Sequence, residues 1–318
     1  MSYAFVFPGQ GSQSPGMLDA LAAEYPVVRE SLQEAGEVLG LDLAGLVASG
    51  PEAELNRTEL TQPALLAAGV ATWRAWQAAG GRPPVRLAGH SLGEYTALVC
   101  AGCLSFADAL RLVRRRGELM QQAVASGEGA MAAILGLDDD AVREACSGAA
   151  DGDVVAAVNF NAPGQVVIAG QRAAVERAAE AAKAAGARRV VPLPVSVPSH
   201  CALMRPAAEA LAPALEAVSW KAPAIPVVNN VDVAIEDDPA RIREALVRQL
   251  YNPVRWVETI QALSAAGVTD IVECGPGKVL AGLTRRIDRS LGMHALVDPA
   301  SITATLEATG PGQGETRS

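Results

Sequence analysis

Residues 85–93 read Val-Arg-Leu-Ala-Gly-His-Ser-Leu-Gly, an apolar run that ends in the pattern G-x-S-x-G. Residues 85–89 are predicted to form a buried strand, and residues 92–101 the helix that follows it. The glycine at each end of the pattern permits the sharp strand-to-helix turn that exposes its serine, here Ser91. The stretch therefore predicts an α/β fold with a parallel sheet and makes Ser91 a candidate nucleophile. The alternative is a serine that only caps the helix.

Three other stretches extend this pattern. The run YAFVF at residues 3–7 is short, apolar and rich in strand formers, and a glycine-rich loop over residues 8–13 follows it. Residues 64–79 are predicted to form a helix, and residues 270–273 another strand. Alternation of strands and helices in this way is typical of a parallel sheet covered by helices.

The middle of the chain follows a different order of elements. Its strands are predicted at residues 130–137, 154–159, 165–169 and 189–194, and its helices at residues 138–146 and 171–185. This strand–helix–strand–strand–helix–strand order is the ferredoxin-like arrangement. We therefore expect a ferredoxin-like subdomain over residues 127–197, inserted into a large α/β domain over residues 1–126 and 198–308. Residues 309–318 are expected to be a disordered tail.

The composition restricts the class of protein. Half of the 318 residues are hydrophobic, which is ample for a packed core, and the net charge is 26 − 35 = −9. With no basic stripe to offset that charge, nucleic-acid binding is excluded as a leading function. No apolar run approaches the roughly 20 residues that a spanning helix needs, and no signal peptide is expected. Five cysteines, with Cys100 and Cys103 in an apolar helix-like stretch, indicate inert thiols in the reduced cytoplasm rather than a redox pair.

A serine nucleophile needs a base, and the chain has three histidines. His90 adjoins Ser91, but its side chain is expected to point elsewhere on so sharp a turn, and His294 lies in a strand-like run and is expected to be structural. His200 lies in a turn where the chain returns to the large domain, so it is the predicted base, with a surface imidazole as the alternative. No acidic residue stands out as its orienter. A dyad in which a backbone carbonyl fixes the imidazole is therefore plausible.

One arginine of a basic cluster is expected to face inward. Helical spacing places Arg116 three or four residues from the apolar side chains of Leu112, Val113, Leu119 and Met120. A buried guanidinium needs an anionic partner, and no obvious one lies nearby in the sequence. A substrate carboxylate would satisfy it, which would mean that Ser91 accepts an acyl group bearing a free carboxylate. Pairing with a distant glutamate is the alternative.

Together these residues resemble the malonyl-CoA:acyl carrier protein transacylases of fatty acid synthesis. The matching motifs occur in order over nearly the whole chain: FPGQGSQ at 7–13, TQPALL at 61–66, GHSLGEYTALVCAG at 89–102, VNFNAPGQVVIAG at 158–170, VPSHCALM at 197–204, VRQLYNPVRW at 247–256 and ECGPGKVL at 273–280. The resemblance implies an α/β-hydrolase-like large domain with a ferredoxin-like insertion. It also implies an active site in the cleft between them.

The resemblance further implies a role for each site residue. Ser91 would take the malonyl group from malonyl-CoA as an ester and pass it to the phosphopantetheine thiol of holo acyl carrier protein, with ping-pong kinetics. His200 would act as general base and then as acid, and Arg116 would bind the malonyl carboxylate.

The remaining expectations concern the backbone and the partners. The backbone N–H groups of Gln10 and Leu92 would form the oxyanion hole, and the main-chain carbonyl of Gln249 would orient the catalytic histidine. No metal and no bound organic cofactor is expected, since the CoA thioester is a substrate. We expect a cytoplasmic monomer that binds neither nucleic acid nor membrane.

Two alternatives to this function stay open. One is a related acyltransferase that serves a polyketide or malonate-decarboxylating system. Methylmalonyl also stays open as the acyl group, because one methyl group changes binding by only about 1–3 kcal/mol. The other is a non-catalytic carrier-binding subunit, against which the intact Ser91, His200 and Arg116 speak. Lys278, Arg285 and Arg286 form a hypothetical docking patch for an acidic carrier protein, with ordinary solvated cations as the alternative.

Overall fold

The computed structural model describes residues 2–125, 127–195 and 197–310 of the chain. Its centre is a five-stranded sheet in the order β7-β2-β1-β8-β9, in which every neighbouring pair is parallel. The strands are β1 (Tyr3–Phe7), β2 (Arg86–Gly89), β7 (Val227–Val228), β8 (Asp270–Glu273) and β9 (Gly292–Ala295). Because β1 is central, its alternating side chains fill both faces: Phe5 and Phe7 enter one hydrophobic core, and Ala4 and Val6 the other.

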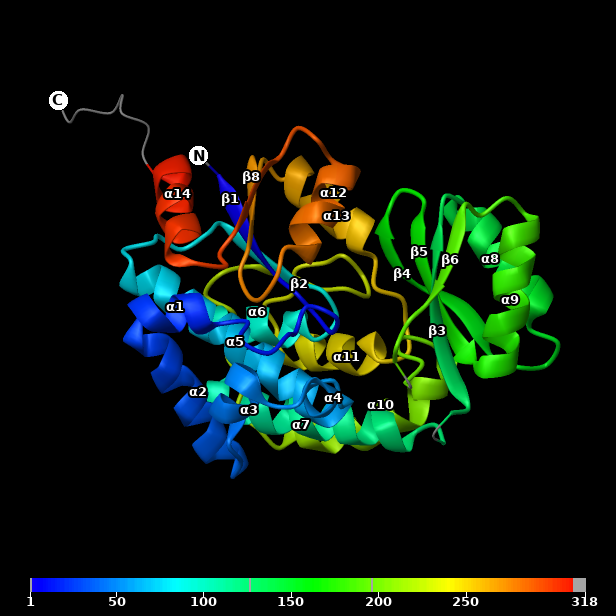
Figure 1. Cartoon of the computed structure of the whole chain (residues 1–318), viewed down its shortest axis with the longest axis horizontal. Helices are drawn as coiled ribbons and strands as arrows, with labels where there is room; N and C mark the ends of the chain where they lie inside the picture. The colour runs from blue at the N-terminus through cyan, green and yellow to red at the C-terminus, as the bar shows by residue number, and fades with distance from the viewer. Residues whose placement is uncertain (1, 126, 196, 311–318) are drawn as a thin grey trace.

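Helices cover both faces of this sheet (Figure 1). The segments are α1 (Asp19–Glu24), α2 (Pro26–Leu39), α3 (Leu43–Ser49), α4 (Glu52–Leu55), α5 (Thr58–Ala78), α6 (Gly93–Cys100), α7 (Phe106–Gln122), a 3₁₀ turn η1 (Ala202–Met204), α10 (Arg205–Glu216), α11 (Pro239–Gln249), α12 (Trp256–Ala265), α13 (Val279–Ile287) and α14 (Pro299–Thr309). None of the described helices is long and apolar enough to cross a membrane.

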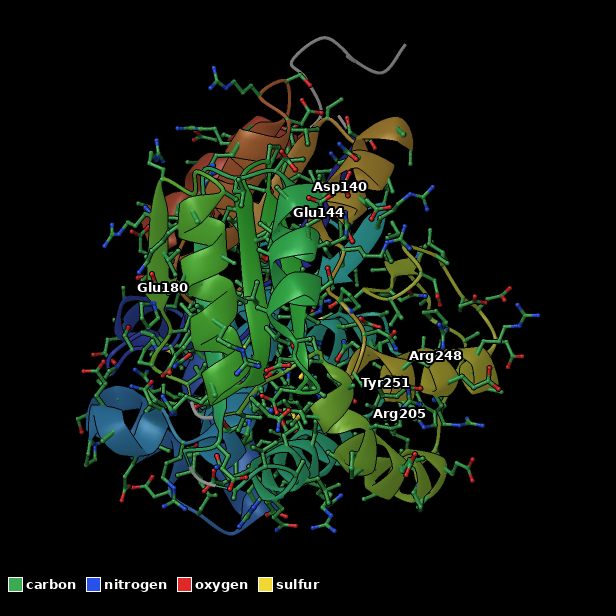
Figure 2. The ribbon with its side chains drawn as sticks, turned by 90° about the vertical axis from the view of Figure 1, so that its right-hand side faces the viewer. Asp140, Glu144, Glu180, Arg205, Arg248 and Tyr251 are labelled. Atoms are coloured by element: carbon green, nitrogen blue, oxygen red, sulfur yellow. The ribbon has the colours of Figure 1, made fainter. Side chains whose placement is uncertain are left out.

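The second unit is a four-stranded antiparallel sheet in the order β4-β5-β3-β6. Its elements are β3 (Gly129–Leu135), α8 (Asp139–Ala149), β4 (Val155–Ala162), β5 (Gln165–Gln171), α9 (Arg172–Ala184) and β6 (Arg189–Pro192). The helices α8 and α9 pack on one face, which Figure 2 shows toward the viewer. The other face packs against the large unit, where Met131 and Val158 share a hydrophobic cluster with Cys201. The strands β3, β4 and β5 therefore bury side chains on both of their faces.

The predicted fold class, a parallel α/β domain with a ferredoxin-like insertion, is confirmed by these two sheets. The exact boundaries of the units stay a prediction, because residues 126 and 196 lie outside the described residues. Of the predicted tail, residues 311–318 also lie outside them, whereas Thr309 ends α14.

The predicted start of the helix at residue 64 is wrong. The helix α5 begins at Thr58 and runs through Pro63, although proline leaves one helical hydrogen bond unmade. Sixteen of its residues are buried, and packing of that extent offsets the missing bond. The helices α1 to α4 and α14 lie in stretches for which the sequence predicted no element.

Close packing between α5 and α7 depends on a glycine. A Cβ atom on Gly117 of α7 would lie 2.8 Å from the Cα atom of Glu59 and 2.8 Å from the carbonyl oxygen of Thr58, both at the start of α5. Those neighbours are backbone atoms that cannot rotate away. The axes of the two helices can approach this closely only because position 117 has no side chain.

We predict that Gly117→Ala lowers the free energy of unfolding by about 1–3 kcal/mol, because the added methyl overpacks the α5–α7 contact. Gly148→Ala is the matched control: Gly148 is an exposed glycine of α8 with nothing within 4 Å of an added Cβ. Its replacement should be neutral or stabilise by up to about 1 kcal/mol, because alanine favours a helix. Urea unfolding at 25 °C measures both. Equal stability of Gly117→Ala and the parent would contradict the packing argument.

Candidate active site

Ser91 lies on the turn between β2 and α6 in a left-handed conformation, with φ = 52°. The turn is sharp enough to exclude side chains on both flanking glycines. A Cβ atom on Gly89 would lie 1.9 Å from the carbonyl carbon of Gly93, and one on Gly93 would lie 2.1 Å from the carbonyl oxygen of Phe7. The G-x-S-x-G pattern is therefore a requirement of backbone approach at this turn.

Asn230 fixes this turn from the loop after β7. Its side-chain Oδ1 accepts a hydrogen bond from the N–H of Ser91 at 2.7 Å, and its Nδ2 donates to the carbonyl oxygen of Gly89 at 2.6 Å. One carboxamide thus holds the backbone on both sides of His90. A residue with φ > 0 other than glycine is strained, and it persists where its surroundings hold it in place.

His200 lies beside the serine hydroxyl. The distance from Ser91 Oγ to His200 Nε2 is 2.7 Å, and that from His200 Nδ1 to the carbonyl oxygen of Gln249 is 2.7 Å. Because a carbonyl oxygen only accepts, Nδ1 carries the proton and Nε2 is free to accept the proton of the hydroxyl. The imidazole is therefore oriented as a base by a neutral backbone group.

The surroundings keep His200 neutral. The side chain is buried, and burial followed by the nearby positive charge of Arg116 lowers its pKa to about 3. The alternative of a surface imidazole does not fit this position.

Arg116 is completely buried, its guanidinium lies 5.7 Å from the centre of the Tyr95 ring, and its hydrogen bonds go to neutral oxygens. Its Nη1 donates to Gln62 Oε1 and its Nη2 to Gln249 Oε1, both at 2.9 Å, and Nη2 lies 3.3 Å from Ser91 Oγ. Its Nε has no partner among the described residues. No described carboxylate forms a salt bridge with it, so the alternative of pairing with a distant glutamate is not found in this part of the chain. The positive charge beside the nucleophile is left for a ligand to neutralise.

A cavity of about 160 Å³ opens above Ser91 between the two units. The large unit contributes Gln10, Thr58, His90, Ser91, Ser199 and His200, and the insertion contributes Met131, Asn159, Asn161, Val167, Leu193 and Val195. No described residue accepts a hydrogen bond from the N–H of Gln10 or of Leu92. Both N–H groups are therefore available to donate to an oxyanion. That of Leu92 lies at the N-terminal end of α6, where the helix dipole also favours negative charge.

Sequence reasoning missed several residues at this site. Asn161 on β4 accepts a hydrogen bond from His90 Nε2 at 2.8 Å, so the His90 ring is engaged across the cleft rather than with the serine hydroxyl. The buried Asn159 has an Oδ1 atom without a partner among the described residues. Register shifts in β4 beside both asparagines mark bulges, which re-aim side chains next to sites. The sequence contains the triplet Asn-Phe-Asn at residues 159–161, but the bulges decide where its asparagine side chains point.

Other candidates have structural roles. His294 on β9 lies 3.2 Å from Asp270 of the neighbouring strand, away from the cavity. All five cysteines are free thiols, and burial raises the pKa values of Cys100 and Cys103, which suits the predicted inert pair. Within the described residues no group of three or more His, Cys, Asp or Glu side chains could hold a metal ion.

Comparison with known proteins gives consistent matches over the chain. The model of the acyl transferase domain family matches residues 4–305. The chain is 60% identical to the malonyl CoA-acyl carrier protein transacylase of Salmonella typhimurium over 304 residues, which cover 96% of this chain and 98% of that protein. It is 46% identical to the transacylase of the same name in Bacillus subtilis, over 96% of each chain.

Solved structures are similar throughout the fold. The acyl carrier protein S-malonyltransferase of Vibrio cholerae is 59% identical with a TM-score of 0.94, over 96% of this chain and 100% of that one. A malonyl-transacylase in complex with a type II polyketide acyl carrier protein, PlMCAT with AntF, gives 58% identity and a TM-score of 0.96, over 97% and 100% of the chains.

The lowered pKa of His200 predicts a loss of stability in acid. The unfolded chain binds a proton at this residue near pH 6.5, whereas the folded state binds it only near pH 3. Below pH 6.5 the free energy of unfolding therefore falls by about 1.4 kcal/mol per pH unit from this group, or about 2 kcal/mol between pH 7 and pH 5. In urea unfolding between pH 7 and pH 5, the free energy of unfolding of His200→Asn should therefore fall by about 2 kcal/mol less than that of the parent. His294→Asn controls for the loss of one histidine, and equal losses in the parent and His200→Asn would contradict the assignment.

Proposed function

The chain belongs to the acyl transferase domain family, and we propose that it transfers a malonyl group from malonyl-CoA to the phosphopantetheine thiol of acyl carrier protein through an ester on Ser91. The observation that carries this proposal is the buried Arg116 guanidinium, which has no carboxylate partner and lies 3.3 Å from the Ser91 hydroxyl. A malonyl group attached to Ser91 ends in a free carboxylate that would neutralise this charge. An acetyl group offers no such partner.

In the first half-reaction the Ser91 hydroxyl oxygen attacks the thioester carbonyl while His200 Nε2 takes its proton. The N–H groups of Gln10 and Leu92 donate to the oxyanion that forms. The carbon–sulfur bond then breaks, and His200 returns the proton to the departing CoA thiol. Throughout, the Gln249 carbonyl holds the imidazole by its Nδ1–H and stabilises the imidazolium.

The second half-reaction reverses these roles. The carrier thiol loses its proton to His200, its sulfur attacks the ester carbonyl, and the bond to Ser91 Oγ breaks as the oxygen regains a proton. A carboxylate bound at Arg116 offsets the positive charge that helps to lower the pKa of His200, so the bound malonyl group makes the base stronger. Every bond made and broken is accounted for by two side chains and two substrates. The proposal therefore includes no metal and no bound organic cofactor.

The setting of the reaction follows from the same features. All of the proposed site residues come from one chain, so the proposal needs only a monomer. Five free thiols suit the reduced cytoplasm. Bacterial relatives of 46–60% identity are malonyl CoA-acyl carrier protein transacylases, which supports a place in fatty acid synthesis. The same chemistry serves a polyketide carrier in the complex of PlMCAT with AntF, so the acceptor distinguishes the two pathways.

Loading of Ser91 tests this function directly. Intact mass measured within seconds of mixing with malonyl-CoA should show one malonyl adduct on the parent and none on Ser91→Ala, and holo acyl carrier protein should discharge it. Arg116→Ala should lower the malonyl-to-acetyl loading ratio by about 10-fold to 100-fold, the range for loss of a hydrogen bond to a charged group. Arg115→Ala, which removes an exposed neighbour on the same helix, should leave the ratio unchanged.

Absence of an adduct from both thioesters, without release of free CoA, would sink the transacylase function and favour the carrier-binding subunit. An adduct that persists on Ser91→Ala would place the nucleophile elsewhere.

We also propose that an acidic carrier protein docks at a surface cleft between α13 and β9. Lys278 and Arg285 line it, and the side chain of neither forms a hydrogen bond or ion pair with a described residue. Arg286 is engaged instead: it donates to the Pro163 carbonyl at 3.1 Å and to Gln165, both at the β4–β5 hairpin. The loop before α13 touches the loop that carries Gln10, since Gly275 packs against Pro8.

The outer face of the insertion is less suitable for an acidic partner. It exposes Asp140 and Glu144 on α8 and Glu180 on α9 (Figure 2), and its cations Arg143 and Lys183 are paired with Asp140 and Glu180. Of the cations labelled beside it, Arg248 is paired with Asp232 and Arg205 stacks on Tyr251. Charge complementarity therefore favours the α13–β9 cleft.

The double variant Lys278→Glu/Arg285→Glu should raise the KM for the carrier about tenfold or more, because charges at the rim of an interface speed the encounter with a charged partner. It should leave the KM for malonyl-CoA unchanged. The matched control, Lys183→Glu with Lys221→Glu, changes the net charge equally at exposed sites outside the cleft. Steady-state kinetics with varied carrier measures both. An unchanged carrier KM in the first pair, or an equal rise in the control, would remove this docking site.

A further inference from the structure

Glu94 is a buried carboxyl group that the proposed mechanism does not use. It lies in the first turn of α6, three residues after Ser91, and is 2% exposed. No salt bridge joins it to a described lysine or arginine. A carboxyl group buried this completely is costly unless hydrogen bonds satisfy it.

Both hydrogen bonds that Glu94 accepts come from residues of the site. Its Oε2 accepts from the side-chain Nε2 of Gln249 at 2.9 Å and from the backbone N–H of Asn230 at 3.0 Å. Gln249 holds Arg116 through Oε1, and Asn230 holds the turn at Ser91 through its side chain. One intervening residue, Gln249 or Asn230, therefore links the Glu94 carboxyl group to the guanidinium and to the turn at Ser91.

We propose that Glu94 is a positioning residue that sets the malonyl preference by orienting the Gln249 carboxamide toward Arg116. The role rests on the proposed contact between Arg116 and the malonyl carboxylate. A carboxamide can be turned either way, and its neighbours decide which. Gln249 Nε2 donates to Glu94 Oε2 and also to the Ser91 carbonyl at 3.0 Å, and both of these oxygens are acceptors.

The reverse orientation would be doubly unfavourable. It would place the NH₂ group of Gln249 against the Arg116 guanidinium, although both are donors. It would also place the carboxamide oxygen of Gln249 against Glu94 Oε2 and the Ser91 carbonyl oxygen, which are both acceptors. With Glu94 in place, Oε1 of Gln249 faces Nη2 of Arg116. Without it, only the Arg116 guanidinium and the Ser91 carbonyl oppose rotation of the carboxamide, so the partner of the guanidinium beside Ser91 is held less firmly.

Glu94 can serve as an acceptor in either protonation state. Burial raises its pKa to about 7, against the opposing effects of the Gln249 and Asn230 hydrogen bonds and the Arg116 charge, while the Asp232 charge adds to the rise. Both donors use Oε2, so a proton on the other oxygen breaks neither contact. A small cavity beside Glu94 is lined in part by the polar Asn229 and Glu236, which suits an amide group at that oxygen. Acceptor geometry, rather than charge, therefore carries the role.

Two substitutions distinguish a role of the Glu94 acceptor oxygen from a role of its charge. Glu94→Gln keeps an acceptor oxygen in the position of Oε2, whereas Glu94→Ala removes it. Initial loading rates with malonyl-CoA and acetyl-CoA should show that Glu94→Ala lowers the malonyl-to-acetyl ratio about 10-fold or more, with the ratio in Glu94→Gln within about threefold of the parent. A general loss of folding would lower both rates alike and leave the ratio unchanged.

The double variant tests whether the effect passes through Arg116. In the Arg116→Ala background, Glu94→Ala should change the ratio no further, because the guanidinium that it positions is gone. A further fall in the ratio, an unchanged ratio in Glu94→Ala alone, or a Glu94→Gln ratio as low as that of Glu94→Ala would each overturn the role. An unchanged ratio in Arg116→Ala alone would instead overturn the proposed carboxylate contact.

A second variant covers the case in which Glu94→Ala does not fold. Gln249→Met removes the same link from the other side and keeps the main-chain carbonyl that holds His200. It should lower the ratio by a similar factor. A ratio equal to that of the parent in Gln249→Met would overturn the positioning role of Glu94.

Discussion

A guanidinium with no exposed surface, held by two neutral carboxamides, is the interaction on which the site depends. Burying a positive charge without an anion is unfavourable, and the folded protein tolerates it because Gln62 and Gln249 each supply a hydrogen-bond acceptor. Three helices must converge for this: α7 carries Arg116, α5 carries Gln62 and α11 ends in Gln249. The missing Cβ of Gly117 lets α7 lie close enough to α5. In the proposed function, a carboxylate-bearing acyl group on Ser91 would neutralise the charge of Arg116.

Gln249 links the charge to the base. Its main-chain carbonyl holds the His200 imidazole, and its side chain contacts Arg116, Glu94 and the Ser91 carbonyl. Because one residue makes all of these contacts, the end of a single helix connects Ser91, His200 and Arg116. A neutral carbonyl suffices as the orienter here, since burial, and after it the charge of the neighbouring guanidinium, lowers the pKa of the imidazole and keeps it unprotonated.

The insertion completes the site from the other side. The parallel sheet exposes Ser91 at the end of β2, as open α/β sheets do, and the antiparallel sheet covers it with Asn159, Asn161 and apolar side chains. The bond from His90 to Asn161 crosses this boundary.

The sequence by itself determined the features that depend on residues a few positions apart. The glycines around Ser91 dictate the turn, the helical spacing of Arg116 dictates its burial, and the order of strands and helices over residues 127–197 dictates the insertion. The turn that returns the chain to the large domain indicated His200, and the resemblance to a known family added Gln249, whose carbonyl contacts that histidine in the structure. The start of α5 was mispredicted because a proline is a strong local signal that tertiary packing overrides. Only the tertiary structure decided that the partners of Arg116 are neutral, and that Asn230 and Glu94 support the site. These contacts join residues 54 to 155 positions apart, and periodicity reports which face of its own helix a side chain occupies but not which distant side chain meets it there.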